Sequence, residues 1–156
     1  MNENPDPRTD PLVQRAREAA LRAYAPYSGF SVGCAVESVD GEIVVGSNME
    51  NACYRLGVCA EISALTAASQ SFGLGRIARI AVAGGNSGDG DLAGENLVTP
   101  CGGCRQSILE AAHLAGRDLP IVCSNGNGTE VEQMRISDLI PRGFGPANLE
   151  DAGSQG

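Results

Sequence analysis

Hydrophobic residues recur at helical spacing in three segments of the chain. Asp10 and Pro11 precede the first apolar run as an N-cap and a first helical residue, and Pro26 lies beyond its end. Glycines at the ends of the other two segments are typical helix stops. We therefore predict three helices, over residues 11–25, 58–71 and 102–116.

Other segments alternate between apolar and polar residues or are rich in β-branched residues, as strands are. Asp40-Gly41 is a tight-turn signal, so residues 30–38 and 42–47 are predicted to form a β-hairpin. Further strands are expected over residues 79–83, 120–123 and 130–136. Residues 84–95, rich in Gly, Asn, Ser and Asp, are expected to form a loop, and residues 137–139 a short helical turn.

The predicted order is helix, two strands, helix, strand, helix, two strands. Helices that alternate with strands favour a three-layer α/β/α sandwich around a mixed five-stranded sheet. The 156 residues suffice for one hydrophobic core, so we predict a single domain over residues 1–145 and a loose polar tail over residues 146–156.

Charge and composition narrow the range of partners. The formal net charge is −8, and all 11 basic residues are arginines scattered along the chain. Because nucleic-acid binding requires a basic patch, this distribution disfavours DNA or RNA as a partner and favours a small neutral solute. No stretch approaches the roughly 20 apolar residues of a membrane span. The polar N-terminus does not resemble a signal peptide, so we expect a cytoplasmic protein.

Six cysteines are present, and two of them form the Cys-x-x-Cys pattern of Cys101 and Cys104. In a chain of this length and expected location, the pattern more often indicates metal or redox chemistry than a disulfide framework. Cys34, Cys53 and Cys123 are expected to be inert buried thiols.

Two motifs begin predicted helices: Cys59-Ala60-Glu61 and Pro100-Cys101-Gly-Gly-Cys104. Helix N-termini carry unpaired N–H groups that stabilise thiolates, and thiolates are good zinc ligands. Cys59, Cys101 and Cys104 would supply three ligands and leave a fourth position open, as in a catalytic zinc site. Glu61 would then lie near the metal as a general acid and base for water.

The same two motifs are those of the zinc deaminases, which act on the amine of a base. The chain also resembles the small homotetrameric cytidine deaminases along nearly its whole length. Further matching stretches are A-P-Y-S-G-F-S-V-G at 25–33, N-M-E-N-A at 48–52 and L-I-P-R-G-F at 139–144. The resemblance implies one Zn²⁺ per subunit, a nucleoside substrate and a homotetramer.

The resemblance also implies roles for residues that bind the substrate. Phe30 would stack against the base, and Asn48 and Glu50 would hydrogen-bond the ribose 3′-hydroxyl. The backbone at Ala60 and the carbonyl of Thr99 would hold the polar edge of the base. The two residues that would contribute to the site of a neighbouring subunit are Tyr54 and Phe144.

One position departs from the family pattern. The tetrameric family usually has an arginine directly after the catalytic glutamate, where it hydrogen-bonds zinc thiolates, but this chain has Ile62. Three thiolates leave the zinc centre with a net negative charge, which raises the pKa of its water. Arg105, directly after Cys104, is expected to supply part of the compensating charge near the metal.

These features predict hydrolytic deamination of cytidine and deoxycytidine to uridine and deoxyuridine, with release of ammonia, in pyrimidine salvage. A deaminase of a modified cytidine or of a nucleoside antibiotic is the nearest alternative. Asn48 and Glu50 favour an ordinary ribose over that alternative. A structural zinc or thiol-redox module is the alternative from another class, but it gives Glu61 no role.

Overall fold

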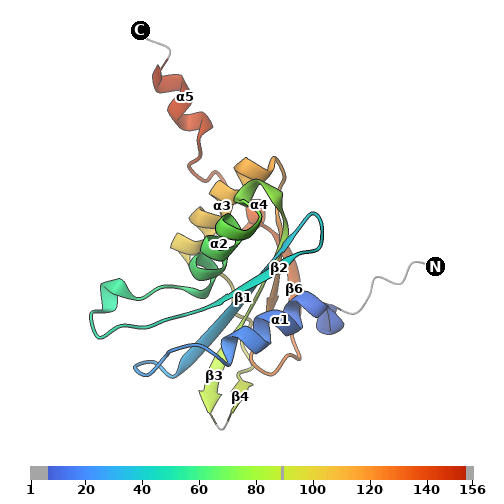
Figure 1. The fold of residues 1–156 in the computed structure, drawn as a ribbon, viewed down its shortest axis with the longest axis vertical. Helices are drawn as coiled ribbons and strands as arrows, with labels where there is room; N and C mark the ends of the chain where they lie inside the picture. The colour runs from blue at the N-terminus through green and yellow to red at the C-terminus, as the bar shows by residue number, and fades with distance from the viewer. Residues whose placement is uncertain (1–6, 89, 154–156) are drawn as a thin grey trace, which may run out of the picture.

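A mixed sheet lies between two layers of helices in the computed structural model, which describes residues 7–88 and 90–153 (Figure 1). Residues 1–6 of the predicted domain and residues 154–156 of the predicted tail lie outside the described residues. The α-helices are α1 (Pro11–Ala20), α2 (Ala60–Ser71), α3 (Gly102–Ala115), α4 (Ile136–Leu139) and α5 (Ala147–Gly153). The strands are β1 (Phe30–Ser38), β2 (Ile43–Ser47), β3 (Ile77–Gly88), β4 (Asp91–Ala93), β5 (Pro120–Ser124) and β6 (Val131–Arg135). Short 3₁₀ turns precede α1, α2 and β3: η1 (Pro7–Thr9), η2 (Tyr54–Leu56) and η3 (Leu74–Arg76).

The strands follow the order β2-β1-β3-β5-β6, and β4 pairs with the far end of β3. β3 and β5 are parallel and the other pairs are antiparallel, which confirms a mixed sheet. The crossover between the parallel strands contains α3, as a parallel connection requires. The predicted hairpin is confirmed, with β1 paired to β2 from Gly33 opposite Ser47 to Glu37 opposite Ile43.

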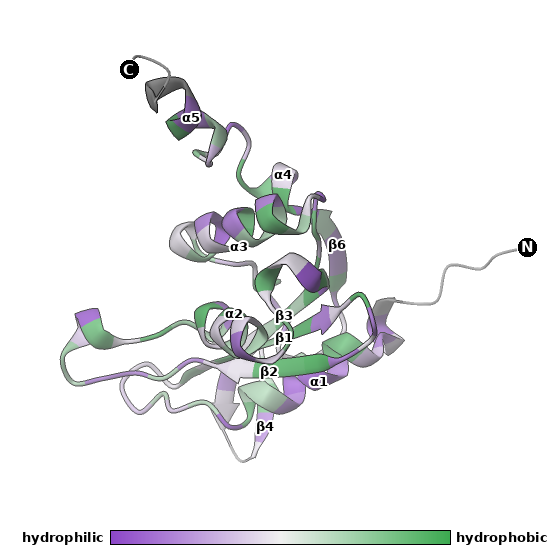
Figure 2. Cartoon of the chain, turned by 45° about the horizontal axis from the view of Figure 1, so that its top comes forward, coloured by the Kyte–Doolittle hydropathy of each residue, from purple (hydrophilic) through white to green (hydrophobic). Residues whose placement is uncertain are grey.

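Separate hydrophobic clusters fill the two faces of the sheet. The larger cluster joins the sheet to α2 and α3, and the smaller one joins it to α1. The central strands between these layers carry many hydrophobic residues, drawn in green in Figure 2. The arrangement confirms the predicted three-layer sandwich, and it places the N-termini of α2 and α3 on the same side of the sheet.

The start of α1 follows from Asp10, whose side chain accepts a hydrogen bond of 2.9 Å from the Leu12 backbone N–H. The same carboxylate pairs with Arg79 of β3 at 2.5 Å, and Arg79 also pairs with Glu37 of β1. All three side chains are partly buried, so these ion pairs anchor the N-terminus of α1 to two neighbouring strands.

Two glycines allow helices to lie close to the sheet. A Cβ atom at Gly33 of β1 would lie 1.9 Å from the carbonyl oxygen of Ala16 in α1. At Gly46 of β2, a Cβ atom would lie 2.4 Å from the backbone nitrogen of Ala64 in α2. Any larger residue at Gly46 would push α2 away from the sheet, and with it the motif at the N-terminus of α2.

The prediction of a loop over residues 84–95 was wrong in its secondary structure. β3 continues to Gly88 alongside β1, and β4 then pairs back onto it. The composition of this segment gave no strand signal, but a backbone ladder does not require apolar side chains when a long neighbouring strand offers partners. The sheet of the described residues therefore has a sixth strand in addition to the five predicted.

The end of the chain also contains more regular structure than its composition indicated. Residues of the predicted polar tail form α5, which extends away from the body of the domain (Figure 1). Before it, the predicted helical turn is confirmed as α4, at whose N-terminus Asp138 accepts a hydrogen bond of 2.9 Å from the Arg135 backbone N–H.

Candidate metal and catalytic site

Three cysteines from two helix N-termini meet at one point. Cys59 is the N-cap of α2, Cys101 is the N-cap of α3, and Cys104 lies in the first turn of α3. Their sulfur atoms all lie within 4.8 Å of one another. The structure therefore brings together the three sulfur atoms that the sequence predicted to converge.

The surroundings of the thiols fit a cation. Backbone hydrogen bonding, chiefly from the Cys104 N–H, lowers the pKa of Cys101. Burial raises the pKa of Cys59 and of Cys104, and the negative charge of Glu61 raises that of Cys104 further. A divalent cation between the sulfur atoms would favour the thiolate form of all three. Three sulfur donors on two neighbouring helix N-termini suit Zn²⁺, with a further position left for another ligand.

Glu61 lies beside this cluster, in the first turn of α2. Only 4% of its surface is exposed, and its Oε2 atom accepts a hydrogen bond of 3.4 Å from Cys104 Sγ. Its carboxylate is therefore held at the cluster by the same helix that supplies Cys59. A buried carboxylate next to a metal-ligating set is a suitable group for moving protons there.

Two further cysteines lie behind Glu61 in the sheet. Cys34 of β1 and Cys123 of β5 both flank Val82 of β3 in register, and both are buried as predicted. Burial raises the pKa of both thiols, that of Cys123 to about 12, and the charge of Glu61 contributes to each rise. Cys53 does not follow the prediction of a buried thiol, because the segment after β2 leaves it exposed.

Asn48 and Glu50 follow β2 and hydrogen-bond the backbone at the start of β1 and just before it. Asn48 Oδ1 accepts a hydrogen bond of 2.7 Å from the Val32 N–H, and its Nδ2 donates at 3.0 Å to the Phe30 carbonyl oxygen. The Glu50 carboxylate accepts hydrogen bonds from the backbone N–H groups of residues 27 and 28 and from the Ser28 hydroxyl. Ser28 Oγ in turn accepts a hydrogen bond of 3.0 Å from the Phe30 N–H.

These bonds mean that both side chains hold the backbone on either side of Phe30. The hydrogen bond from the Ser28 hydroxyl also lowers the pKa of Glu50, which favours the ionised form of this carboxylate. The sequence motif around residue 25 contains Ser28, but sequence reasoning assigned it no role. Its position two residues before Phe30, the aromatic predicted to stack on the base, was the available signal.

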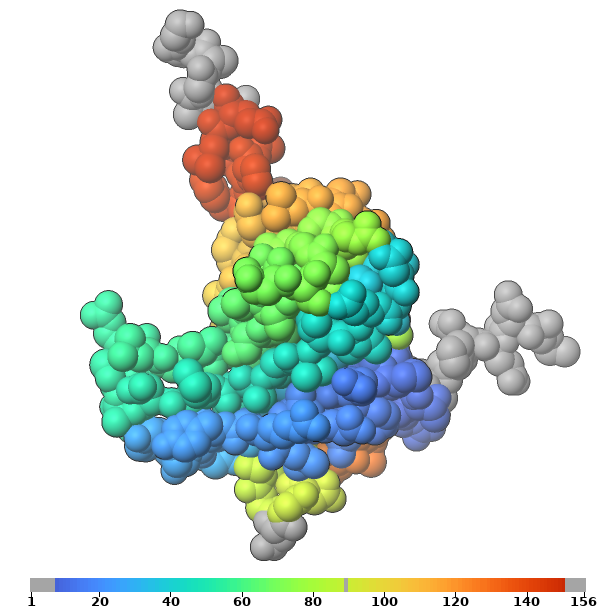
Figure 3. Space-filling view, viewed as in Figure 1, coloured from blue at the N-terminus to red at the C-terminus, as the bar shows by residue number. Residues whose placement is uncertain are grey.

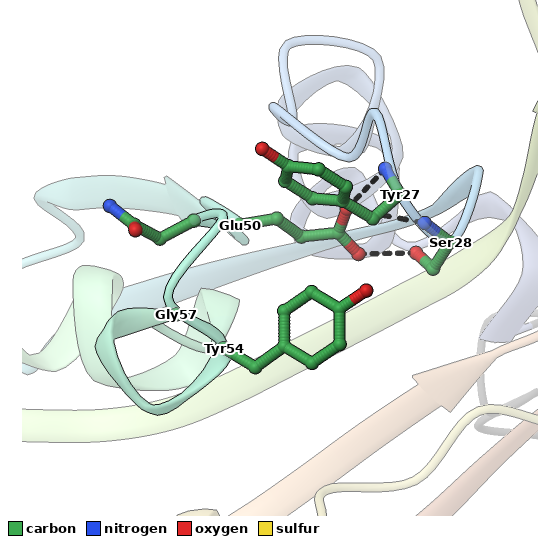
Figure 4. Close-up of a pocket in the computed structure, with 6 residues that line it drawn as sticks. Tyr27, Ser28, Glu50, Tyr54 and Gly57 are labelled. Atoms are coloured by element: carbon green, nitrogen blue, oxygen red, sulfur yellow. Dashed lines mark hydrogen bonds between the residues drawn. The ribbon is translucent and has the colours of Figure 1, made fainter.

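A cavity of about 350 Å³ lies next to Glu50 and is partly walled by Tyr27 and Tyr54 (Figure 4). The two rings pack edge to face, with centroids 5.9 Å apart and planes at 62°. Tyr54 comes from η2, and 79% of its surface is exposed. The ring therefore closes the cavity on one side and presents most of its surface outward.

A second cavity, of about 460 Å³, lies between Phe30 and residues 93–99, which include Thr99. Thr99 lies two positions before Cys101, so the wall of this cavity leads directly into the cysteine cluster. Ala60 is buried at the first position of α2, next to Cys59. Phe30 and Thr99 thus line one cavity, while Ala60 is buried beside the cluster, and the roles of all three toward a substrate stay predictions.

Phe144 lies elsewhere on the described chain. Its side chain is 59% exposed, and Gln106 Nε2 of α3 donates a hydrogen bond of 2.8 Å to its carbonyl oxygen. Within one chain, the residues lining the two cavities come from other segments. A contribution from Phe144 to a neighbouring site stays a prediction.

Arg105 braces the backbone beside the cluster. Its guanidinium donates hydrogen bonds to the carbonyl oxygens of Pro100 at 2.7 Å and Leu139 at 2.9 Å, and to Thr99 Oγ1 at 3.1 Å. Its predicted role toward the zinc thiolates stays a prediction. Ile62 lines a groove between α2 and α3 together with Leu65.

No helix among the described residues is long and apolar enough to cross a membrane.

Comparisons with known proteins agree with this geometry. A family model described as the cytidine and deoxycytidylate deaminase zinc-binding region matches residues 8–115. A cytidine deaminase from Mycobacterium tuberculosis is 38% identical over 145 residues, which cover 93% of this chain and 96% of that protein. A cytidine deaminase from Halalkalibacterium halodurans is 35% identical over 140 residues, covering 90% of this chain and 96% of that protein.

Solved structures show the same similarity. The crystal structure of a cytidine deaminase from Burkholderia pseudomallei superposes with a TM-score of 0.73 at 37% identity, covering 85% of this chain and 96% of that one. A crystal structure of the cytidine deaminase from Mycobacterium tuberculosis gives a TM-score of 0.66 at 35% identity. The match covers 86% of this chain and 94% of that one.

Proposed function

This chain belongs to the cytidine deaminase family, and on that premise we propose that its cysteine cluster and Glu61 deaminate cytidine and deoxycytidine by hydrolysis. The products are uridine or deoxyuridine and ammonia, a reaction of pyrimidine salvage. The observation that carries the proposal is the convergence of Cys59, Cys101 and Cys104 on one point with the buried carboxylate of Glu61 beside it. A thiol-redox module has no use for that carboxylate, and a structural zinc site normally has four protein ligands.

In this proposal the three thiolates would hold one Zn²⁺ per chain, and the ion would supply a Lewis acid able to make a water acidic near neutral pH. Glu61 accepts a proton from that water and delivers it to N3 of the pyrimidine while the water oxygen adds to C4. Glu61 then carries the remaining hydroxyl proton to the C4 amine, and the C–N bond breaks to release ammonia. One water is consumed and one ammonia is formed, so Glu61 ends as it began.

The residues in front of the cluster are proposed to orient the base. Phe30 offers an aromatic face to the flat pyrimidine, and the backbone at Ala60 and the carbonyl of Thr99 face its polar edge. Buried hydrogen-bonding partners discriminate against analogues that lack a polar group far better than an apolar wall does. The test is release of ammonia from cytidine by zinc-loaded protein, with N4-acylcytidine and blasticidin S as competing substrates.

We expect Glu50→Ala and Asn48→Ala to raise KM for cytidine by about 10-fold or more, because a ribose hydroxyl would be left without a partner and Phe30 would lose its backbone supports. Steady-state kinetics with cytidine test this. Ser28→Ala is the matched control, since it removes the support at the Phe30 N–H but no group assigned to the ribose. If all three variants share one KM, the ribose assignment is wrong and a modified substrate becomes the better interpretation.

A homotetramer is proposed from the surfaces that a single chain leaves exposed. The segment between β2 and α2, drawn in teal in Figure 3, projects from the body and carries Tyr54 and Leu56, which are 79% and 60% exposed. Phe144 is exposed as well. Large apolar side chains on a projecting segment favour contact with another copy of the chain.

Sedimentation at assay concentration should give about four times the 16.0 kDa chain mass. Substitution of Tyr54 by Ala is expected to weaken both the assembly and cytidine binding. An active monomer would contradict the tetramer proposal.

A cytoplasmic location is proposed from the state of the cysteines. None of the six is paired in a disulfide: three form the cluster proposed to hold zinc, and Cys53 is exposed. Thiols of this number persist in a reducing compartment and would be prone to oxidation outside it.

A further inference from the structure

Residues 94–100 connect β4 to α3 without regular secondary structure, and residues 94–99 line the second cavity. This segment ends at Pro100, one position before the zinc ligand Cys101. A segment without its own backbone ladder takes its shape from the groups that hold it. The position of Thr99 opposite Phe30 therefore depends on contacts with the rest of the domain.

One such contact comes from Asn125, the residue directly after β5, which is 1% exposed. Its Nδ2 donates hydrogen bonds of 3.0 Å to the Glu95 carbonyl oxygen and of 3.0 Å to Thr129 Oγ1. Its Oδ1 accepts hydrogen bonds from the N–H groups of Thr129 at 3.0 Å and Glu130 at 3.1 Å. Both donors and both acceptor sites of this amide are used. One fully satisfied side chain therefore joins two segments: the turn after β5, residues 125–130, and the cavity wall, residues 94–99.

The same turn makes further contacts with the start of the wall. The Asn127 N–H donates to the Gly94 carbonyl oxygen, and the Gly94 N–H donates to Asn127 Oδ1, both at 3.0 Å. A Cβ atom at Gly126 would lie 2.4 Å from the backbone of β4, so the two backbones are in direct contact. Arg17 of α1 donates to the carbonyl oxygens of residues 125 and 126, which ties the turn to the opposite layer.

At its other end, the wall is held by Arg105 through Pro100 and Thr99. The wall is thus fixed at two points, one beside the zinc ligands and one at the end of β5. We propose that Asn125 is a positioning residue for the nucleoside: it acts through the Glu95 carbonyl to keep the 95–99 wall at the separation from Phe30 that the base requires. This inference rests on the proposed function and deepens it, because Asn125 itself lies behind the wall.

The test compares Asn125→Asp with Thr129→Val. Asn125→Asp removes both Nδ2 donors and keeps the oxygen that accepts from the turn, so the bond to Glu95 is lost. Thr129→Val removes the other partner of the same Nδ2 group and leaves the bond to Glu95 in place. We expect Asn125→Asp to raise KM for cytidine about 10-fold with kcat within about twofold of wild type, since about 1.4 kcal/mol corresponds to a factor of 10. Thr129→Val should keep a KM near that of wild type.

Hydrogen exchange and zinc content give readouts that are independent of turnover. Amides of residues 95–99 should exchange about 10-fold faster in Asn125→Asp than in Thr129→Val, while both variants keep the zinc content of wild type. If Asn125→Asp does not fold, Asn127→Ala replaces it, because this exposed side chain holds Gly94 from the surface. Equal KM values in the two variants, or unchanged exchange at residues 95–99, would overturn the proposal. If wild-type protein does not deaminate cytidine, the proposed function fails, and hydrogen exchange still decides whether Asn125 holds the wall.

Discussion

Replacement of Glu61 by Gln should lower kcat for cytidine by about 10²–10⁴-fold, the usual contribution of a general acid and base. The amide has nearly the same shape as the carboxylate, so zinc content, folding and KM should change little. The loss is specific because Glu61 moves protons at three atoms of the reaction: the water oxygen, N3 and the departing nitrogen. Single-turnover kinetics with cytidine and metal analysis of the same preparation measure both effects.

Glu18→Gln is the matched control for this prediction. Glu18 lies on the exposed side of α1, in the layer on the opposite face of the sheet, and pairs only loosely with Arg15 at 4.0 Å. The control should have the kinetics of wild type. Near-native kcat in Glu61→Gln would remove Glu61 from the mechanism, and loss of zinc in that variant would instead make it a residue that holds the metal site together.

Replacement of Cys104 by Ser should abolish both zinc binding and activity. Cys104 is 1% exposed and lies in the first turn of α3, so the nearly isosteric serine should fit the helix. A neutral hydroxyl is a much poorer zinc ligand than a thiolate, and two thiolates are too few for a stable site. The zinc content measured after dialysis should fall from about one ion per chain to nearly none. The loss of kcat/KM should exceed the loss of about 10²–10⁴-fold that is expected for Glu61→Gln.

Cys53→Ser provides the comparison, since Cys53 is exposed and lies outside the cluster. This variant should bind zinc and turn over cytidine as wild type does. Full zinc content and activity in Cys104→Ser would show that the ligand set is wrong.

The sequence predicted an element well where the residues that determine it lie within or next to that element. Asp10 and Pro11 start α1 as expected, and the hairpin turn after β1 lies at the expected position. The two cysteine motifs begin α2 and α3 as predicted, because a helix N-terminus and its cap are determined within a few residues.

The extension of β3 and the pairing of β4 could not be predicted in the same way. Residues 84–95 lack the alternation that identifies a strand, and their pairing depends on β1, more than fifty positions earlier in the chain. Gly85 shows the cause: a Cβ atom there would lie 2.3 Å from the carbonyl oxygen of Ala93, so only glycine permits this approach. A close contact between two backbones leaves no periodic side-chain pattern in either segment.

The roles of polar side chains also differ in whether local sequence or tertiary structure reveals them. The sequence alone was sufficient to predict that three sulfur atoms and one carboxylate lie together, because Cys59, Glu61, Cys101 and Cys104 are closely spaced on two helix starts. Tertiary structure was needed to show that Asn48 and Glu50 hold the backbone around Phe30, and that Asn125 holds the wall opposite it. The physical reason is the distance along the chain over which each interaction acts. A helix cap or a metal motif acts over a few residues. The amide of Asn125 instead binds a carbonyl group thirty positions away, which only folding brings within 3.0 Å.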